Sequence, residues 1–177
     1  SLQSALADTL SDAVRPYVAV SEPRFALRHV RVIDGTGAPP LEDQVVLVAD
    51  GRISAVGPAR STKIPDGTRI LDLEGRTVIP GLVMMHEHLV YPTDRTAEAD
   101  RMYPSHAITF PRLYLAAGVT TMRTAGTAEP TTDINLKRAI ESGASVGPDI
   151  DVTGIWMDGA PPLVLQEATV RDAGDAR

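Results

Sequence analysis

The sequence predicts an α/β protein in which a small antiparallel β-domain precedes the first βα units of an incomplete TIM barrel. Residues 25–73 show the period of strands interrupted by turn residues, and from residue 79 strands alternate with helices. The chain has 177 residues, fewer than 100 of them after Pro80, whereas a complete (β/α)8 barrel takes about 250. We therefore expect that the barrel does not close within this chain.

The composition is that of an ordinary globular protein. Hydrophobic residues make up 43% and charged residues 23% of the chain, close to the globular average. Seventeen Lys and Arg against 23 Asp and Glu give a net charge of −6. No basic face is concentrated in the sequence, and no apolar run approaches the roughly 20 residues of a membrane span. We therefore expect neither nucleic acid nor a membrane as partner.

Residues 1–24 are expected to form an N-terminal helical extension. Apolar residues recur there at spacings of three and four, namely Leu2, Leu6, Leu10, Ala13 and Val14. The helix should end near Arg15-Pro16, because proline lacks a backbone donor. Its polar face has few Lys or Arg, so packing on its own barrel or on a neighbouring subunit is favoured over membrane attachment, and we expect a homo-oligomer. The start at Ser1 is compatible with a removed signal, which favours a periplasmic or secreted protein over a cytoplasmic one.

Residues 25–78 are expected to form a small β-sandwich-like domain. Asp50-Gly51 is a strong hairpin signal between two strand-like stretches, and Glu74-Gly75 is a second turn. His29 lies among strand residues and is expected to be structural or exposed. The strand-like stretches are residues 25–33, 45–48, 53–56 and 68–73.

Residues 79–177 are expected to form the N-terminal part of the barrel. Residues 79–85 are almost continuously apolar, which is typical of a strand buried on both faces of a parallel sheet. The pattern then predicts helices that end at Gly118 and Gly143, each followed by a strand, over residues 119–123 and 149–153. Parallel βα units bring the loops after their strands to one rim.

Two histidines end the first of these strands. Residues i and i+2 of a strand face the same way, so His86 and His88 can present both imidazoles to one ion while Glu87 points to the opposite face. In α/β barrels this end of the strand is where catalytic groups collect. The chain has no cysteine, so imidazole and carboxylate are the available ligands, which suits a divalent ion such as zinc. Two ligands fall short of the usual three or four, and the others must come from elsewhere.

Three further residues in or near the rim loops are candidates for substrate binding: Tyr91, Arg123 and Trp156. The two aromatic side chains either contact substrate or pack their loops onto the barrel. Arg123 either binds a substrate carboxylate in bidentate fashion or pairs with a structural acid. The sequence leaves both alternatives open.

Taken together, these motifs resemble the amidohydrolase superfamily from about residue 25 to the end. Pro80-Gly81-Leu82 followed by His86-x-His88 is similar to its first barrel strand, and residues 118–123 are similar to its second. The small β-domain that precedes the barrel in this superfamily resembles the segments at residues 34–37, 50–53 and 56–57. The nearest branch is that of imidazolonepropionase-like and Xaa-Pro dipeptidase-like enzymes, which includes ochratoxin-hydrolysing ones. Met84 and Thr124 stand where the family often has aspartate.

The resemblance implies metal-dependent hydrolysis of an amide C–N bond by metal-activated water, with a small-molecule amide or a dipeptide-like compound as substrate. It also implies a binuclear centre, with zinc as the expected metal, whose bridging carboxylated lysine, two further histidines and aspartate come from later strands. Only His86 and His88 map onto this chain, so the general base is expected outside it. The isolated chain is then inactive and needs the remainder of the barrel, as a C-terminal portion or a second chain. The alternatives are a hydrolase or deaminase of cyclic amides, lactones or heterocycles on the same fold, or a non-catalytic metal-binding fragment that needs a partner chain.

Overall fold

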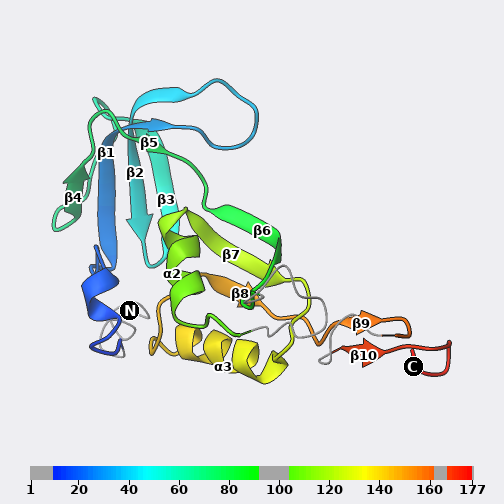
Figure 1. The fold of residues 1–177 in the computed structure, drawn as a ribbon. Helices are drawn as coiled ribbons and strands as arrows, with labels where there is room; N and C mark the ends of the chain where they lie inside the picture. The colour runs from blue at the N-terminus through cyan, green and yellow to red at the C-terminus, as the bar shows by residue number, and fades with distance from the viewer. Residues whose placement is uncertain (1–9, 92–103, 162–166, 177) are drawn as a thin grey trace. The chain divides into compact units, whose positions relative to one another are not determined.

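A computed structural model describes residues 10–91, 104–161 and 167–176 (Figure 1). The contacts within the chain divide it into two units, Ser1–Pro80 and Gly81–Arg177. No helix in the described ranges is both long and apolar enough to cross a membrane.

The first unit is built on one five-stranded sheet with the order β3-β2-β1-β4, in which β5 also pairs with β1. The first three strands are antiparallel, and the turn at Asp50-Gly51 joins two of them as predicted. In contrast, β4 and β5 run parallel to β1, so the expectation of an antiparallel unit is wrong for these two strands. The connection over residues 59–68 carries the chain back to the start of β1, and a crossover of this kind allows parallel pairing. The strands are β1 (Arg24–Val32), β2 (Leu41–Ala49), β3 (Arg52–Pro58), β4 (Arg69–Asp72) and β5 (Thr77–Val78).

A bulge at His29 decides which face of the sheet each half of β1 serves. His29 has a φ of 58°, and the register of β1 against β2 shifts at this point. The extra residue turns Val30 and Val32 to the face opposite Ala26. The sheet therefore has an apolar cluster on each face, and β1 contributes to both.

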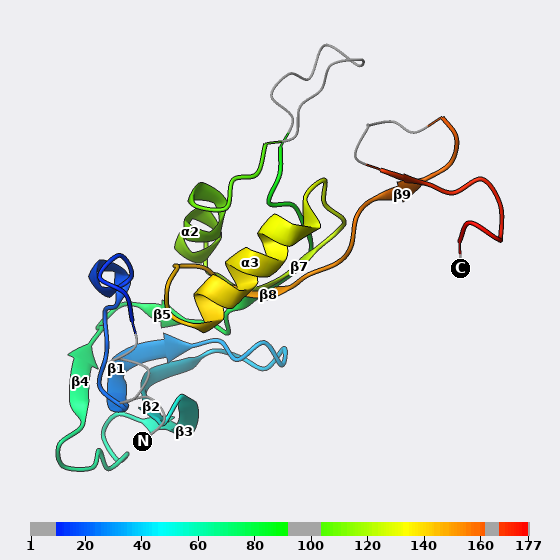
Figure 2. The same cartoon turned by 90° about the horizontal axis from the view of Figure 1, so that it is seen from below.

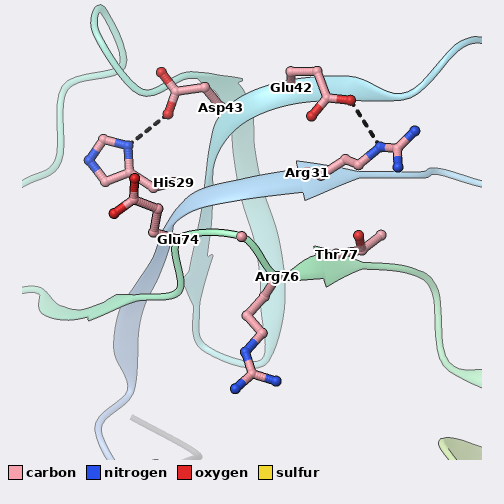
Figure 3. Close-up of a pocket in the computed structure, with 8 residues that line it drawn as sticks. His29, Arg31, Glu42, Asp43, Glu74, Arg76 and Thr77 are labelled. Carbon is pink, nitrogen blue, oxygen red and sulfur yellow. Dashed lines mark hydrogen bonds and ion pairs between the residues drawn. The ribbon is translucent and has the colours of Figure 1, made fainter.

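His29 also makes a hydrogen bond across the sheet. Its Nδ1 lies 2.7 Å from Oδ1 of Asp43, a second residue with positive φ. Figure 3 shows both residues in a pocket of about 410 Å³. The other charged side chains of its lining belong to Arg31, Glu42, Glu74 and Arg76. Three carboxylates thus face two arginines and a histidine, so the pocket has little excess charge to select an ion of one sign.

The segment before β1 differs from the expected helix. Residues 10–24 contain a single 3₁₀ turn, η1 (Arg15–Tyr17), and no α-helix, so the helix is wrong for residues 10–14. Residues 1–9 lie outside the described residues. Pro16 stands at the start of η1, where a missing N–H leaves no hydrogen bond unmade. Proline therefore begins a short helical turn here and does not end a long helix.

The second unit contains the parallel sheet β6-β7-β8, formed by β6 (Leu82–Glu87), β7 (Val119–Thr124) and β8 (Asp149–Asp151). Helix α2 (Thr109–Ala116) packs on β7, and α3 (Pro130–Glu141) packs on β8 (Figure 2). This order confirms the predicted alternation of strands and helices. Strands and helices share one core, centred on Leu89, Val119, Met122, Leu136 and Ile150. A separate parallel pair follows, β9 (Met157–Asp158) with β10 (Ala168–Thr169).

Strand β6 is apolar but lies exposed in this chain. Val83 is 58% exposed and Met85 is 62% exposed. β7 pairs with one edge of β6, and no other strand of the described residues pairs with it. Leu82 and Met84, whose side chains alternate with these, are exposed as well. The expectation of a strand buried on both faces is therefore wrong for the described part of the chain.

Gly81→Ala is expected to lower the free energy of unfolding by about 1–3 kcal/mol, the usual cost of overpacking. An added Cβ would lie 2.8 Å from Cβ of Thr120 and closer still to the other side-chain atoms of that residue. The backbone of β7 is fixed by the shared core, so it cannot simply move away. Urea unfolding followed by circular dichroism measures the change.

The matched control is Gly154→Ala, because a Cβ added there meets nothing within 4 Å. Its free energy of unfolding should stay within about 0.5 kcal/mol of the parent. Equal effects of the two substitutions would show that Thr120 does not restrict residue 81.

Candidate functional site

Strand β6 brings two histidines to its carboxyl end. His86 is an exposed residue of the strand, and His88 follows it in a half-buried position. Their ring centroids are 5.4 Å apart, with the ring planes at 85°. Two imidazoles on one tetrahedral zinc ion, with metal–nitrogen distances of about 2.1 Å, have centroids about 5 Å apart. The separation of the two rings therefore matches that of two imidazoles on a single divalent ion.

Further ligands for such an ion are not gathered around the pair. Within residues 10–91, 104–161 and 167–176, no three His, Asp or Glu side chains form a group that could hold a metal. The described chain thus brings two candidate ligands together, and their role in metal binding stays a prediction.

The carbonyl of Gly126 determines how His88 is oriented. Nδ1 of His88 lies 3.2 Å from this oxygen. When Nδ1 carries the proton it donates to the carbonyl, which leaves Nε2 free to bind a metal. A backbone carbonyl in this position is a common orienting partner of metal-binding histidines.

Trp156 packs against the same loop. Its Nε1 donates a hydrogen bond to the carbonyl of Ala125 over 3.2 Å, and its ring lies 5.9 Å from the His88 ring. A Cβ on Gly126 would lie 2.5 Å from this Nε1, and Gly126 has a φ of +86°. Only glycine satisfies both the backbone conformation and the close approach of the indole. The structure therefore brings Trp156 and His88 together, as part of one packed loop.

Thr124 stands at a position where the superfamily that the sequence resembles often has aspartate. Its side chain organises this loop by hydrogen bonds. Its buried hydroxyl accepts from the backbone N–H of Thr153 over 2.8 Å, and the Thr153 hydroxyl donates to the Thr124 carbonyl over 2.9 Å. The N–H of Gly126 in turn donates to the Thr153 hydroxyl over 2.7 Å. The network joins the ends of β7 and β8 to the residue whose carbonyl faces His88. Thr124 thus supports the site without a carboxylate.

Glu87 points toward the helices, in agreement with the alternation of side chains along a strand. Its Oε2 accepts a hydrogen bond from the hydroxyl of Tyr114 on α2, over 2.6 Å, and the same hydroxyl lies 3.3 Å from the His88 carbonyl. Burial, together with the carboxylate of Glu87, raises the pKa of Tyr114 well above its ordinary value. The hydroxyl therefore keeps its proton and remains the donor. No pattern in the sequence predicts a contact between Tyr114 and Glu87, which lie 27 residues apart.

The two remaining candidates have different surroundings. Nε of Arg123 lies 3.6 Å from Oδ2 of Asp151 on the neighbouring strand, and the arginine side chain is half exposed. Because Arg123 alternates with the buried Met122 and Thr124, it lies on the sheet face that the helices leave open. Tyr91 is an exposed residue three positions beyond His88. A role of either residue in substrate binding stays a prediction.

Asp133 is a residue of this region that the sequence pattern does not single out. Its side chain is 1% exposed, and neither carboxylate oxygen makes a hydrogen bond of acceptable geometry. Burial raises the pKa of Asp133 above its ordinary value; the nearby Thr127 hydroxyl opposes this shift, Glu129 adds to it and His88 opposes it. An aspartate in the first turn of a helix is common, since it favours the helix dipole. No sequence signal therefore distinguishes it.

A parallel βα sheet with a histidine pair at the carboxyl end of one strand defines a class, that of α/β proteins with a candidate metal site at the rim of the sheet. Comparison with known proteins narrows it. An imidazolonepropionase of Stenotrophomonas maltophilia is 38% identical over 104 residues, which are 58% of this chain and 25% of the relative. An allantoinase of Streptomyces avermitilis is 32% identical over 157 residues, 88% of this chain and 33% of the relative.

Solved structures agree with the sequence relatives. The structure of a Xaa-Pro dipeptidase with methionine bound in its active site matches with a TM-score of 0.64 and 25% identity, over 76% of this chain and 34% of the dipeptidase. No family model matches the chain. The chain belongs to the amidohydrolase superfamily, which confirms the resemblance seen in the sequence. It spans about a quarter to a third of the length of these relatives.

Tyr114→Phe is expected to lower the free energy of unfolding by about 1–3 kcal/mol, because the half-buried Glu87 carboxylate loses its partner. Glu87→Gln keeps an oxygen that accepts from Tyr114, so its loss should be smaller. Urea unfolding of both variants and of the double variant gives a double-mutant cycle, for which we expect a coupling of at least about 0.5 kcal/mol. Additive effects would mean that the two side chains do not interact.

Proposed function

We propose that this chain is part of a metal-dependent hydrolase that cleaves an amide C–N bond with water. The observation that carries the proposal is the pair of His86 and His88 at the carboxyl end of β6, with Nδ1 of His88 directed to the Gly126 carbonyl. The names of the relatives support hydrolysis of amide-type C–N bonds. Because the chain spans only part of their length, the other ligands and the general base are proposed to lie in the remainder of a barrel.

A divalent ion, when bound, supplies Lewis acidity that activates water and polarises the scissile carbonyl. His86 and His88 would hold this ion, for which zinc, in a binuclear centre, is our proposal. The other residues of the chain hold His88 and the end of β6 in place. The Gly126 carbonyl fixes the tautomer of His88, the indole of Trp156 shields one side of its ring, and Tyr114 fastens the end of β6 to α2.

Substrate contacts are proposed for the open face of the sheet and its rim. Arg123 is only loosely paired with Asp151, at 3.6 Å, so its guanidinium is available to a substrate carboxylate. Trp156 and Tyr91 flank the histidine pair in space and in sequence, respectively, and offer apolar surface to the rest of the substrate.

Two substrate classes follow from the two kinds of relative. The structural likeness to a Xaa-Pro dipeptidase favours a dipeptide-like amide, and the open Arg123 suits its carboxylate. The sequence likeness to an imidazolonepropionase and an allantoinase favours a heterocyclic amide as the second candidate. Assays of the full-length protein with dipeptides, N-acyl amino acids and cyclic amides, with and without added zinc, distinguish the two. No metal-dependent cleavage in either set would contradict the proposal.

His86→Ala in the full-length protein is expected to reduce metal-dependent hydrolysis at least a thousandfold, because the ion loses one of its two ligands from this chain. The measurement is kcat/KM with the best substrate of the panel, together with the bound metal per protein. His29→Ala is the control, since His29 belongs to the first unit and bonds to Asp43; its activity should stay within about threefold. Activity of the His86 variant within tenfold of the parent would exclude the site.

Val83→Asp tests whether further barrel strands cover β6. In the isolated chain Val83 is 58% exposed, so the substitution should change the free energy of unfolding by less than about 0.5 kcal/mol. In the full-length protein the same carboxylate would be buried against the added strands and helices, and we expect a loss of more than about 3 kcal/mol. Equal, small effects in both proteins would show that β6 stays open.

A further inference from the structure

We propose that Thr153 is a positioning residue of the metal site, because its hydroxyl holds the backbone of Gly126 in the orientation that keeps Nε2 of His88 free for a metal ion. The inference rests on the proposed function and adds to it a residue outside the expected ligand set. Thr153 reaches His88 through two hydrogen bonds, one on each side of Gly126.

The Thr153 hydroxyl is fixed in direction because each of its bonding positions is occupied. Its hydrogen is donated to the Thr124 carbonyl over 2.9 Å, and its oxygen accepts the N–H of Gly126 over 2.7 Å. A hydroxyl has one hydrogen and two lone pairs, so the Thr124 hydroxyl, 3.0 Å away, is the donor to the second lone pair. The acceptor that holds the Gly126 N–H therefore cannot turn away without breaking bonds to the end of β7.

The peptide group that carries the Gly126 carbonyl is held from its other end. Its N–H belongs to Thr127 and donates to the Gly154 carbonyl over 3.2 Å. Thr153 and Gly154, which follow β8, thus fix the two peptide groups that meet at Gly126. With both groups fixed and a φ of +86°, the carbonyl has one direction, toward Nδ1 of His88.

The Gly126 carbonyl selects one of the two neutral tautomers of His88. A carbonyl oxygen only accepts, so the 3.2 Å contact is a hydrogen bond when the proton is on Nδ1. In the other tautomer, the lone pair of Nδ1 would face the lone pairs of the oxygen, which is repulsive. A peptide group that donates at its N–H also accepts more strongly at its carbonyl. The arrangement therefore favours the proton on Nδ1, and Nε2 keeps the lone pair that a metal ion needs.

An ordinary structural role of Thr153 would end at the link between the two strands. Its N–H donates to the Thr124 hydroxyl over 2.8 Å and its hydroxyl donates to the Thr124 carbonyl, and these bonds join the two segments without Gly126. A role of that kind predicts only a loss of stability when the hydroxyl is removed. The positioning role predicts, in addition, weaker metal binding and a different tautomer of His88.

The test uses Thr153→Val in the full-length protein, because valine is close to threonine in shape and lacks the hydroxyl. Zinc affinity is measured by competition with a chromogenic chelator, and the urea midpoint of the metal-free protein reports stability. We expect zinc affinity to fall about tenfold or more. Thr153→Ser restores the hydroxyl, so its zinc affinity should stay within about threefold of the parent, short of the loss expected for a missing orienting partner.

Thr127→Val is the matched control, since it removes a second threonine hydroxyl from the same loop. Thr127 is 1% exposed, and its hydroxyl accepts from the N–H of Glu129 over 3.2 Å instead of from Gly126. The urea midpoint should fall, whereas zinc affinity should stay short of a tenfold loss. Unchanged affinity in Thr153→Val, or equal losses of affinity in the two valine variants, would overturn the inference and leave the proposed function intact.

The tautomer is read directly by NMR of the ring nitrogens in metal-free protein that carries isotope-labelled histidine, at an alkaline pH at which the imidazole is neutral. His88→Gln identifies the signals. We expect the proton on Nδ1 in the parent and a shift of the population toward Nε2 in Thr153→Val. A parent protein in which His88 carries its proton on Nε2 would overturn the inference, even where the variant fails to fold. Absence of zinc binding by the parent protein would overturn the inference and the proposed function together.

Discussion

The parallel pairing of β6 with β7 is the constraint on which the candidate site depends. It places Glu87 beside Thr124 at the ends of the two strands, and the N–H of Ala125 donates to the Glu87 carbonyl over 2.9 Å. Only with this register does the loop after β7 reach His88. The loop then contributes the Gly126 carbonyl on one side of the imidazole, and it forms the surface on which Trp156 packs. The histidine pair is local in sequence, but its orientation comes from residues almost forty positions away.

Local patterns in the sequence were sufficient for strands β1 to β4 and β6 to β8 and for helices α2 and α3. They did not predict the short strands β5, β9 and β10, and they predicted a helix over residues 10–14 that the structure does not have. Strand alternation and glycine at helix ends act over a few residues, and the elements of the second unit follow them closely. The same rules could not give the direction of β4 and β5 beside β1, since direction depends on the path of the connecting chain. They also misplaced the role of Pro16, which is compatible with the start of a helical turn as well as with the end of a helix.

The residues that support the site show why sequence alone missed them. Tyr114 contacts Glu87 and Gly126 contacts His88 across the fold. Each of the two also has an ordinary local explanation, as a helix residue and as a turn residue, respectively. Thr124 is the opposite case, because the sequence analysis singled out this position and the structure changes its interpretation. A missing aspartate predicts a weaker support of the metal ligands, whereas the structure shows a hydroxyl network that reaches the same loop by another route. At the end of β7 the buried hydroxyl of Thr124 accepts a hydrogen bond from the N–H of Thr153.

The bulge at His29 has a consequence for how the first unit unfolds. Because β1 changes face there, Ala26 belongs to one apolar cluster and Val30 to the other, with a single backbone running through both. β1 lies between β2 and β4 in the sheet and contributes residues to both clusters. Detaching β1 therefore exposes both clusters at once. The two faces of this sheet therefore lose their structure in one cooperative step, in which β1 acts as the shared element of a single folding unit.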